Sequence, residues 1–186
     1  RFSSMLHAAV DTRLEADVAC GTSLSGGIDS STIAALCNQS SNTSFSHRAF
    51  SAVFPGFAKD ESMQIQQVSQ QCGLTSYMTT PSAQDLADQL KSLLHYQDEP
   101  IGSASVFAQW CVYKLAKEQG VTVLLDGQGA DEVLGGYTKY THWFLQEQIR
   151  DKGWTDVQAQ AQTFRKNHFL DTWSWRNRVA AMLPTW

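Results

Sequence analysis

The chain has 186 residues, of which 42% are hydrophobic, and it carries a formal net charge of −4 at pH 7. This length allows one substantial hydrophobic core, so we expect a single domain over residues 1–186. The slightly acidic charge argues against a general binder of nucleic acids or of anionic membranes, because Lys and Arg provide most contacts to phosphate groups.

Apolar runs alternate with helical patterns in the first part of the chain. Residues 18–24 predict a short strand, and residues 28–37 predict a helix that follows a tight loop. The Ser- and Asn-rich segment 39–47 predicts a loop, and residues 49–54 predict a second strand. Asp60 fits the N-cap of the next helix.

The same alternation continues up to residue 125. Residues 75–79 predict a strand, and Ser82 with Asp85 forms a capping-box signature for the helix behind it. The leucines of this helix recur at helical spacing and predict one buried stripe: Leu86, Leu90, Leu93 and Leu94. Residues 105–119 predict another helix, and the apolar run 121–125 predicts a strand buried on both faces.

This order of elements predicts an α/β fold, with a twisted parallel sheet and helices on both of its faces. We expect residues 1–136 to form the α/β core and residues 137–186 to form a helical extension. Ligands of such sheets bind beyond the carboxyl ends of the strands. The glycine-rich loops after Leu24 and after Leu125 both lie at such ends, so we expect them to face one site.

The cysteines indicate a reducing compartment. They are widely spaced, lack a Cys-x-x-Cys pair and have apolar neighbours, which favours buried free thiols: Cys20, Cys37, Cys72 and Cys111. The sequence contains no run of about 20 apolar residues that could span a membrane and no signal-peptide pattern at its start. A cytoplasmic protein is therefore expected.

The first glycine-rich loop, SLSGGIDSS at residues 23–31, has the properties of an anion-binding loop. Gly26 and Gly27 allow a sharp turn with exposed N–H groups, and the following helix presents its positive N-terminal end. Three hydroxyls add further donors: Ser25, Ser30 and Ser31. An alternative interpretation is that Asp29 or Ser30 merely caps the helix and the glycines form an ordinary turn.

The second loop, DGQGADEVLGGY at residues 126–137, again places acids among glycines. Its acidic residues are Asp126, Asp131 and Glu132. A carboxylate beside a phosphate is repelled unless a cation lies between them, and oxygen ligands completed by phosphates and water suit Mg²⁺. We therefore expect Asp29 and Asp131 to hold a magnesium ion that neutralises a polyphosphate.

Both loops resemble those of a known family. SGGIDSS resembles the SGGxDS pyrophosphate loop of the N-type ATP pyrophosphatases, and LLDGQGADEVLGGY resembles the second motif of the asparagine synthetase family, G-x-G-[SAG]-D-E-x-x-G-G-Y. The segment DEPIG from Asp98 is similar to another part of that family. The resemblance implies an adenine nucleotide alpha-hydrolase-like fold with a nucleotide-binding core.

The resemblance also implies a reaction and a set of site residues. Family members transfer AMP from ATP to a carboxylate, release pyrophosphate and let ammonia form the amide; in asparagine synthetase the acid is aspartate, and a glutaminase domain supplies the ammonia. The implied nucleotide-binding residues are Leu24, Ser25, Gly26, Gly27, Asp29, Ser30, Ser31, Ala52, Asp126 and Gly127. Leu24 and Ala52 would border adenine, and Asp126 and Gly127 would lie near the ribose. Asp29, Gln128 and Asp131 are the implied catalytic residues, and Asp29 and Asp131 the metal ligands.

The chain departs from the family in three ways. Gln128 stands where many asparagine-forming enzymes have a Glu, and an amide cannot take a proton from the incoming amine. The glutaminase domain and a later phosphate-binding lysine are expected outside these residues, so we expect a fragment truncated at both ends, which could be inactive alone. Other functions stay open: an amidoligase or lactam-forming enzyme with another acid, or a non-catalytic adenine-nucleotide-binding module. A tRNA-modifying enzyme is disfavoured by the lack of a cysteine pair and a basic face.

Overall fold

The computed structural model describes residues 1–40, 44–167 and 174–180, and it divides the chain into two compact units, Arg1–Gln128 and Gly129–Trp186. The first unit contains helices α1 (Phe2–Leu14), α2 (Ile28–Gln39), α3 (Ser62–Gln71), α4 (Ala83–Gln97) and α5 (Ala104–Glu118) and strands β1 (Cys20–Ser23), β2 (Phe45–Ala52), β3 (Thr75–Thr79) and β4 (Val123–Leu125). The second unit contains helices α6 (Ala130–Leu134), α7 (Thr138–Lys152), α8 (Trp154–Lys166) and α9 (Trp175–Ala180).

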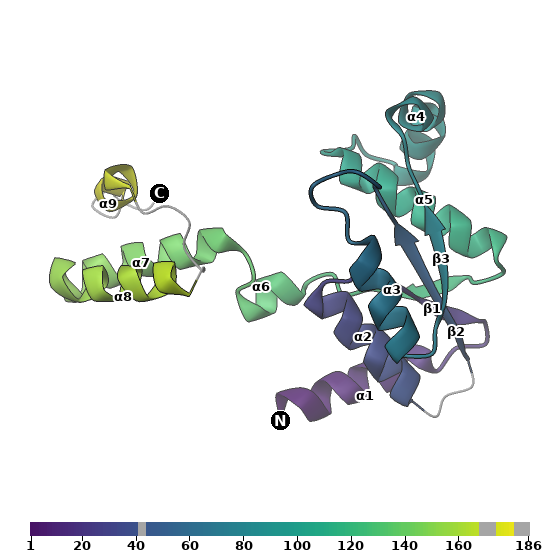
Figure 1. Cartoon of the computed structure of the whole chain (residues 1–186), viewed down its shortest axis with the longest axis horizontal. Helices are drawn as coiled ribbons and strands as arrows, with labels where there is room; N and C mark the ends of the chain where they lie inside the picture. The colour runs from purple at the N-terminus through teal and green to yellow at the C-terminus, as the bar shows by residue number, and fades with distance from the viewer. Residues whose placement is uncertain (41–43, 168–173, 181–186) are drawn as a thin grey trace. The chain divides into compact units, whose positions relative to one another are not determined.

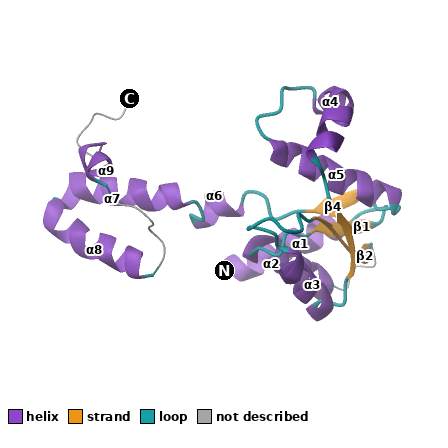
Figure 2. Cartoon of the chain, turned by 45° about the horizontal axis from the view of Figure 1, so that its top comes forward, coloured by secondary structure: helices purple, strands orange, loops and turns teal. Residues whose placement is uncertain are grey.

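The described strands of the first unit form one parallel sheet with the order β3-β2-β1-β4. Helices α1, α2 and α3 lie on one face of this sheet, and α5 lies on the other (Figure 1; Figure 2). The predicted α/β fold with a parallel sheet between helices is therefore confirmed. Among the described residues, no helix is long and apolar enough to cross a membrane.

Alternating side chains of the strands supply a separate core to each face of the sheet. On β2, Ala49 belongs to the core shared with α1, α2 and α3, whereas Phe50 belongs to the core with Val112 and Ala116 of α5. Successive side chains of a strand point to opposite faces, so neighbouring residues serve different layers. Phe50 is completely buried, and truncating such a side chain typically costs about 3–5 kcal/mol.

Several local expectations hold. Ser82 and Asp85 form the predicted capping box of α4, in which each backbone N–H donates to the other side chain. Strand β3 spans the predicted residues, and α5 agrees with its predicted range to within a residue at each end. All four cysteines are free, as predicted, but only Cys20 and Cys37 are buried, whereas Cys72 and Cys111 are partly exposed. Burial raises the pKa of the Cys37 thiol to about 12.

Other local expectations are wrong, each for a tertiary reason. The predicted loop 39–47 is cut short because β2 already begins at Phe45, whose ring is buried and whose backbone lies opposite Cys20; residues 41–43 of that segment lie outside the described residues. The leucine stripe of α4 is only partly buried, since Leu90 and Leu94 remain 38% and 39% exposed.

Asp60 is not the N-cap of α3. The N-cap is Glu61, which makes no capping hydrogen bond with its side chain. The carboxylate of Asp60 instead accepts hydrogen bonds from the N–H of Phe54 and the hydroxyl of Ser62. The residue therefore ties together the loop that leads into the helix.

The helical extension is confirmed as helical where it is described. Helices α7 and α8 pack through Leu145, Ile149, Val157 and Ala161, which form a buried cluster inside the second unit. Residues 168–173 and 181–186 of the predicted extension lie outside the described residues. The expected boundary at residues 136 and 137 stays a prediction.

Candidate functional site

The first glycine-rich loop is fastened to the sheet at Leu24. The N–H of Leu24 donates to the carbonyl oxygen of Phe50 at 2.9 Å, and its own carbonyl oxygen accepts the hydroxyl of Ser51 at 2.6 Å. Its side chain is 1% exposed and lies in the core with α2. The loop therefore starts from a fixed point beside the carboxyl end of β2, where Ala52 lies.

Gly26 allows this loop to lie directly on α3. Its φ is 82°, a value that residues with a Cβ rarely adopt, and a Cβ placed there would lie 2.7 Å from the Cβ of Gln64. It would also approach the backbone N of Ile65 at 3.1 Å. The glycine is thus required twice, by the backbone conformation and by the close approach of α3.

Helix α2 begins at Ile28 without a side-chain cap. Its N-cap is Gly27, and within the described part of the chain no side chain caps this end. The alternative interpretation, in which Asp29 or Ser30 serves as a cap, is therefore wrong. Uncapped N–H groups at a helix N-terminus, together with the helix dipole, attract anions.

The loop hydroxyls lie within or beside this helix end. The Oγ of Ser30 accepts the N–H of Ser25 at 3.2 Å and lies 3.0 Å from the Oγ of Ser25. Ser25 in turn accepts the N–H of Gly27 at 3.3 Å. The Oγ of Ser31 is buried and has no hydrogen-bond partner among the described residues, so it has unused hydrogen-bonding capacity.

The start of the second loop packs against the first. A Cβ on Gly127 would lie 2.9 Å from the backbone N of Ser30 and 3.0 Å from the Cβ of Asp29. At the same edge, the buried hydroxyl of Thr22 donates to the carbonyl oxygen of Leu125 at 3.2 Å. The carboxyl ends of β1 and β4 therefore bring Gly127 next to Asp29, as expected for loops that share a site.

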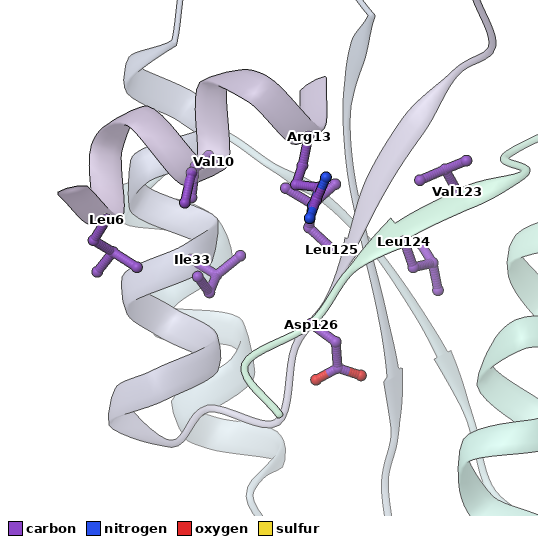
Figure 3. Close-up of a pocket in the computed structure, with 9 residues that line it drawn as sticks. Leu6, Val10, Arg13, Ile33, Val123, Leu124, Leu125 and Asp126 are labelled. Atoms are coloured by element: carbon purple, nitrogen blue, oxygen red, sulfur yellow. The ribbon is translucent and has the colours of Figure 1, made fainter. Parts of the chain in front are cut away.

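Asp126 is oriented by a residue of α5. The Nε2 of Gln109 donates to one of its carboxylate oxygens at 3.1 Å. Asp126 also lines a cavity of about 320 Å³ between α1, α2 and β4, with Leu6, Val10, Arg13 and Ile33 (Figure 3). That cavity is mainly apolar. Asp126 is a predicted site residue that lines it, but no residue of the first glycine-rich loop does, so the cavity is distinct from that loop.

The remaining acids of the second loop lie in the second unit. Asp131 lies in the first turn of α6, and its carboxylate occupies the space beside Gly136 that a Cβ would fill. The hydroxyl of Tyr137 donates to Glu132 at 2.8 Å; this bond lowers the pKa of Glu132 and raises that of Tyr137 to about 12. Gln128, the last residue of the first unit, is exposed.

The described side chains suit a metal ion that takes most of its ligands from phosphates and water. Among the described residues there is no cluster of three or more His, Cys, Asp or Glu side chains that could hold an ion. The carboxylate of Asp29 makes no hydrogen bond or ion pair within the described ranges and lies at the uncapped end of α2. One or two carboxylates with phosphates and water are the usual ligands of Mg²⁺. Pairing of Asp29 with Asp131 stays a prediction.

Sequence reasoning missed how the loops are held in place. It did not single out Thr22, Ser51 or Gln109, and it assigned Asp60 to a helix cap. Each hydrogen-bonds to a residue of another element or to the opposite end of its own loop. Only the hydroxyls at the ends of buried strands gave a signal, because a buried hydroxyl needs a partner.

Comparison with known proteins gives the same family as the sequence motifs of these two loops. A family model described as asparagine synthase matches residues 1–186. The putative asparagine synthetase [glutamine-hydrolyzing] 2 of Methanocaldococcus jannaschii is 33% identical over 146 residues, 78% of this chain and 28% of that protein. The putative asparagine synthetase [glutamine-hydrolyzing] of Mycobacterium tuberculosis is 31% identical over 144 residues, 74% of this chain and 21% of that protein.

A third relative gives the same result. The asparagine synthetase [glutamine-hydrolyzing] 1 of Bacillus subtilis is 30% identical over 135 residues, which are 73% of this chain and 21% of that protein. The chain thus spans between 21% and 28% of the length of these three relatives.

Proposed function

Because the chain belongs to the asparagine synthase family, we propose that it binds ATP and forms the nucleotide-binding part of an amide-forming synthetase. The observation that carries this proposal is the uncapped N-terminus of α2, with the free carboxylate of Asp29 on its first turn and Gly127 packed against it. An uncapped helix end with free N–H groups favours a phosphate. An acid at the same place favours a metal-bound phosphate.

The proposed reaction has two steps. A carboxylate oxygen of the substrate attacks the α-phosphorus of ATP, the bond to the bridging oxygen breaks, and pyrophosphate leaves with the electron pair. Ammonia then attacks the carbonyl carbon of the acyl-adenylate, AMP leaves, and the nitrogen loses a proton to give the amide. By family membership we propose aspartate as the acid and asparagine as the product.

The residues of the first loop would orient the pyrophosphate end of ATP. The N–H groups of the first turn of α2 and the hydroxyls of Ser25, Ser30 and Ser31 supply donors, and such fixed donors stabilise charge that develops on a leaving group. The hydroxyls of Ser25 and Ser30, which hydrogen-bond to each other, would turn toward the phosphates when ATP binds.

Two acids would hold the metal, and a bound Mg²⁺ would supply positive charge against the leaving pyrophosphate. Asp29 and Asp131 are proposed as its protein ligands. Leu24 and Ala52 are proposed to border the adenine, and Asp126, held by Gln109, to lie near the ribose.

Gln128 bears on which acid the enzyme activates. A Gln side chain can donate and accept hydrogen bonds but cannot remove a proton from an amine. Its role is therefore proposed as orienting the acyl-adenylate or the nucleophile. A related amidoligase or lactam-forming enzyme with another acid is the second candidate, and pyrophosphate release with that acid but not with aspartate would favour it.

The parent protein would contain the source of ammonia. We propose a glutaminase domain or subunit as the partner, because the named relatives are glutamine-hydrolyzing and several times longer than this chain. In the intact parent, pyrophosphate formation should depend on both aspartate and glutamine.

Calorimetry of ATP binding to this chain, with and without Mg²⁺, tests the proposed site. We expect binding that requires Mg²⁺ and that Asp29→Ala and Asp131→Ala both weaken. Equal affinity with and without Mg²⁺ in all three proteins would remove the metal assignment. No binding by a correctly folded chain, followed by no binding in the intact parent, would refute the nucleotide site itself.

A further inference from the structure

The loop between β2 and α3 is closed by one carboxylate. An oxygen of Asp60 accepts the N–H of Phe54 at 2.9 Å, and its two oxygens lie 2.8 and 2.7 Å from the hydroxyl of Ser62. Inside the loop, the N–H of Phe57 donates to Phe54 and the N–H of Asp60 donates to Phe57, each at 3.0 Å. Asp60 therefore fixes where the loop leaves the sheet and where α3 begins.

Both ends of this loop adjoin the proposed nucleotide site. Phe54 comes two residues after Ala52, which is proposed to border the adenine. Helix α3 starts at Ser62, and Gly26 of the first loop packs on Gln64 and Ile65 near its start. A shift of the α3 terminus would therefore reach the phosphate-binding loop, while a shift of Phe54 would reach the base.

The loop presents surface that a nucleotide base could cover. Phe54 is 38% exposed and Phe57 is 62% exposed, and aromatic rings stack favourably on bases. The N–H of Phe54 and the hydroxyl of Ser62 lower the pKa of Asp60, so this carboxylate is ionised at neutral pH and its hydrogen bonds are charge-assisted.

We propose that Asp60 is a positioning residue for the adenine nucleotide, acting through Phe54 at the base and through the start of α3 at the phosphate loop. It does not touch the reacting atoms. This inference rests on the proposed function for its ligand, but the positioning itself is a property of the protein without nucleotide.

The variants that test it are Asp60→Ala, Asp60→Asn and, as a matched control, Asp85→Ala. Asp85 also accepts a backbone N–H and a serine hydroxyl, within the capping box of α4, so the control removes the same chemistry elsewhere. Amide hydrogen exchange by mass spectrometry reports on the loops without nucleotide. ATP affinity by calorimetry, well below the melting temperature of each variant, reports on binding.

We expect Asp60→Ala to speed exchange both in residues 53–62 and in residues 24–31, and to weaken ATP binding about tenfold. Asp60→Asn keeps one acceptor for the N–H of Phe54, so its exchange rates and its ATP affinity should lie between those of the unaltered chain and those of Asp60→Ala. Asp85→Ala should speed exchange only around residue 82 and leave ATP affinity unchanged.

Unchanged exchange in residues 24–31 of Asp60→Ala would overturn the inference, and so would equal loss of ATP affinity in Asp60→Ala and Asp85→Ala. The proposed function is judged separately, by whether the unaltered chain or its intact parent binds ATP. Amide hydrogen exchange in residues 24–31 tests the positioning role of Asp60 whether or not the chain binds ATP.

Discussion

Two pairs of glycines show how similar loops use the same residue for different purposes. Gly26 and Gly127, in the first unit, lie against the backbones of α3 and α2, so a side chain there would collide with another element. Gly136, in the second unit, lies against the carboxylate of Asp131, five residues earlier. Gly135 has a φ of 73° and open space around it.

The neighbours of these glycines determine whether a substitution changes the stability of the fold or the position of a functional side chain. Backbone atoms of a neighbouring helix cannot move without moving the helix, whereas a carboxylate can rotate away at little energetic expense. Substitutions at Gly26 and Gly127 should therefore reduce the stability of the fold. A substitution at Gly136 should instead change the position of an acid that is proposed to bind metal.

The largest effect is expected for Gly26→Ala. Its positive φ costs a Cβ-bearing residue about 1–2 kcal/mol, and the contact with Gln64 adds an overpacking cost of about 1–3 kcal/mol. We expect the free energy of unfolding to fall by about 3 kcal/mol in a urea titration. Gly56→Ala is the matched control, because Gly56 has a φ of 86° but nothing within 4 Å, so only the first cost should appear.

Gly127→Ala should come next. The new Cβ would lie 2.9 Å from the backbone N of Ser30, but the backbone conformation needs no glycine. We expect a loss of about 1–3 kcal/mol in the free energy of unfolding, with weaker ATP binding because the first turn of α2 is displaced. Gly102→Ala, with open space around it, should change stability by less than about 0.5 kcal/mol. Equal results for the two variants would mean that the loops do not touch.

Gly136→Ala should affect ATP binding more than stability. The obstructing atoms belong mainly to the flexible carboxylate of Asp131, so we expect a stability change below about 1 kcal/mol. Metal-dependent ATP binding should weaken as much as in Asp131→Ala, because both variants remove the acid from its place. A large loss of stability with unchanged ATP binding would contradict this division.

Tyr137→Phe should have the smallest effect. The hydroxyl of Tyr137 lowers the pKa of Glu132, so its stabilising contribution is present at neutral pH and is lost as the pH falls through that lowered pKa. The raised pKa of Tyr137, about 12, means that its contribution is lost again only as the pH rises through that value. An NMR titration should show the pKa of Glu132 return toward its ordinary value in Tyr137→Phe; an unchanged value would mean that the bond does not form.

The family, the alternation of strands and helices, and the features that depend on near neighbours in the chain can all be predicted from the sequence. The capping box of Ser82 and Asp85 needs residues only three positions apart, and it was predictable for that reason. The two glycine-acid motifs identify the family in the same way, because a loop that binds phosphate needs its glycines, hydroxyls and acid within a few residues.

Tertiary structure decided whatever depends on which elements become neighbours. Asp60 has the sequence context of a helix cap, yet it binds Phe54 because β2 and α3 bring the ends of one loop together. Phe45 starts a strand because Cys20 lies opposite it, and Gly127 must be a glycine because α2 lies beside it. Each contact depends on how whole strands and helices pack, even where, as for Phe54 and Asp60, the two residues belong to one loop, and no local pattern encodes the distance between them.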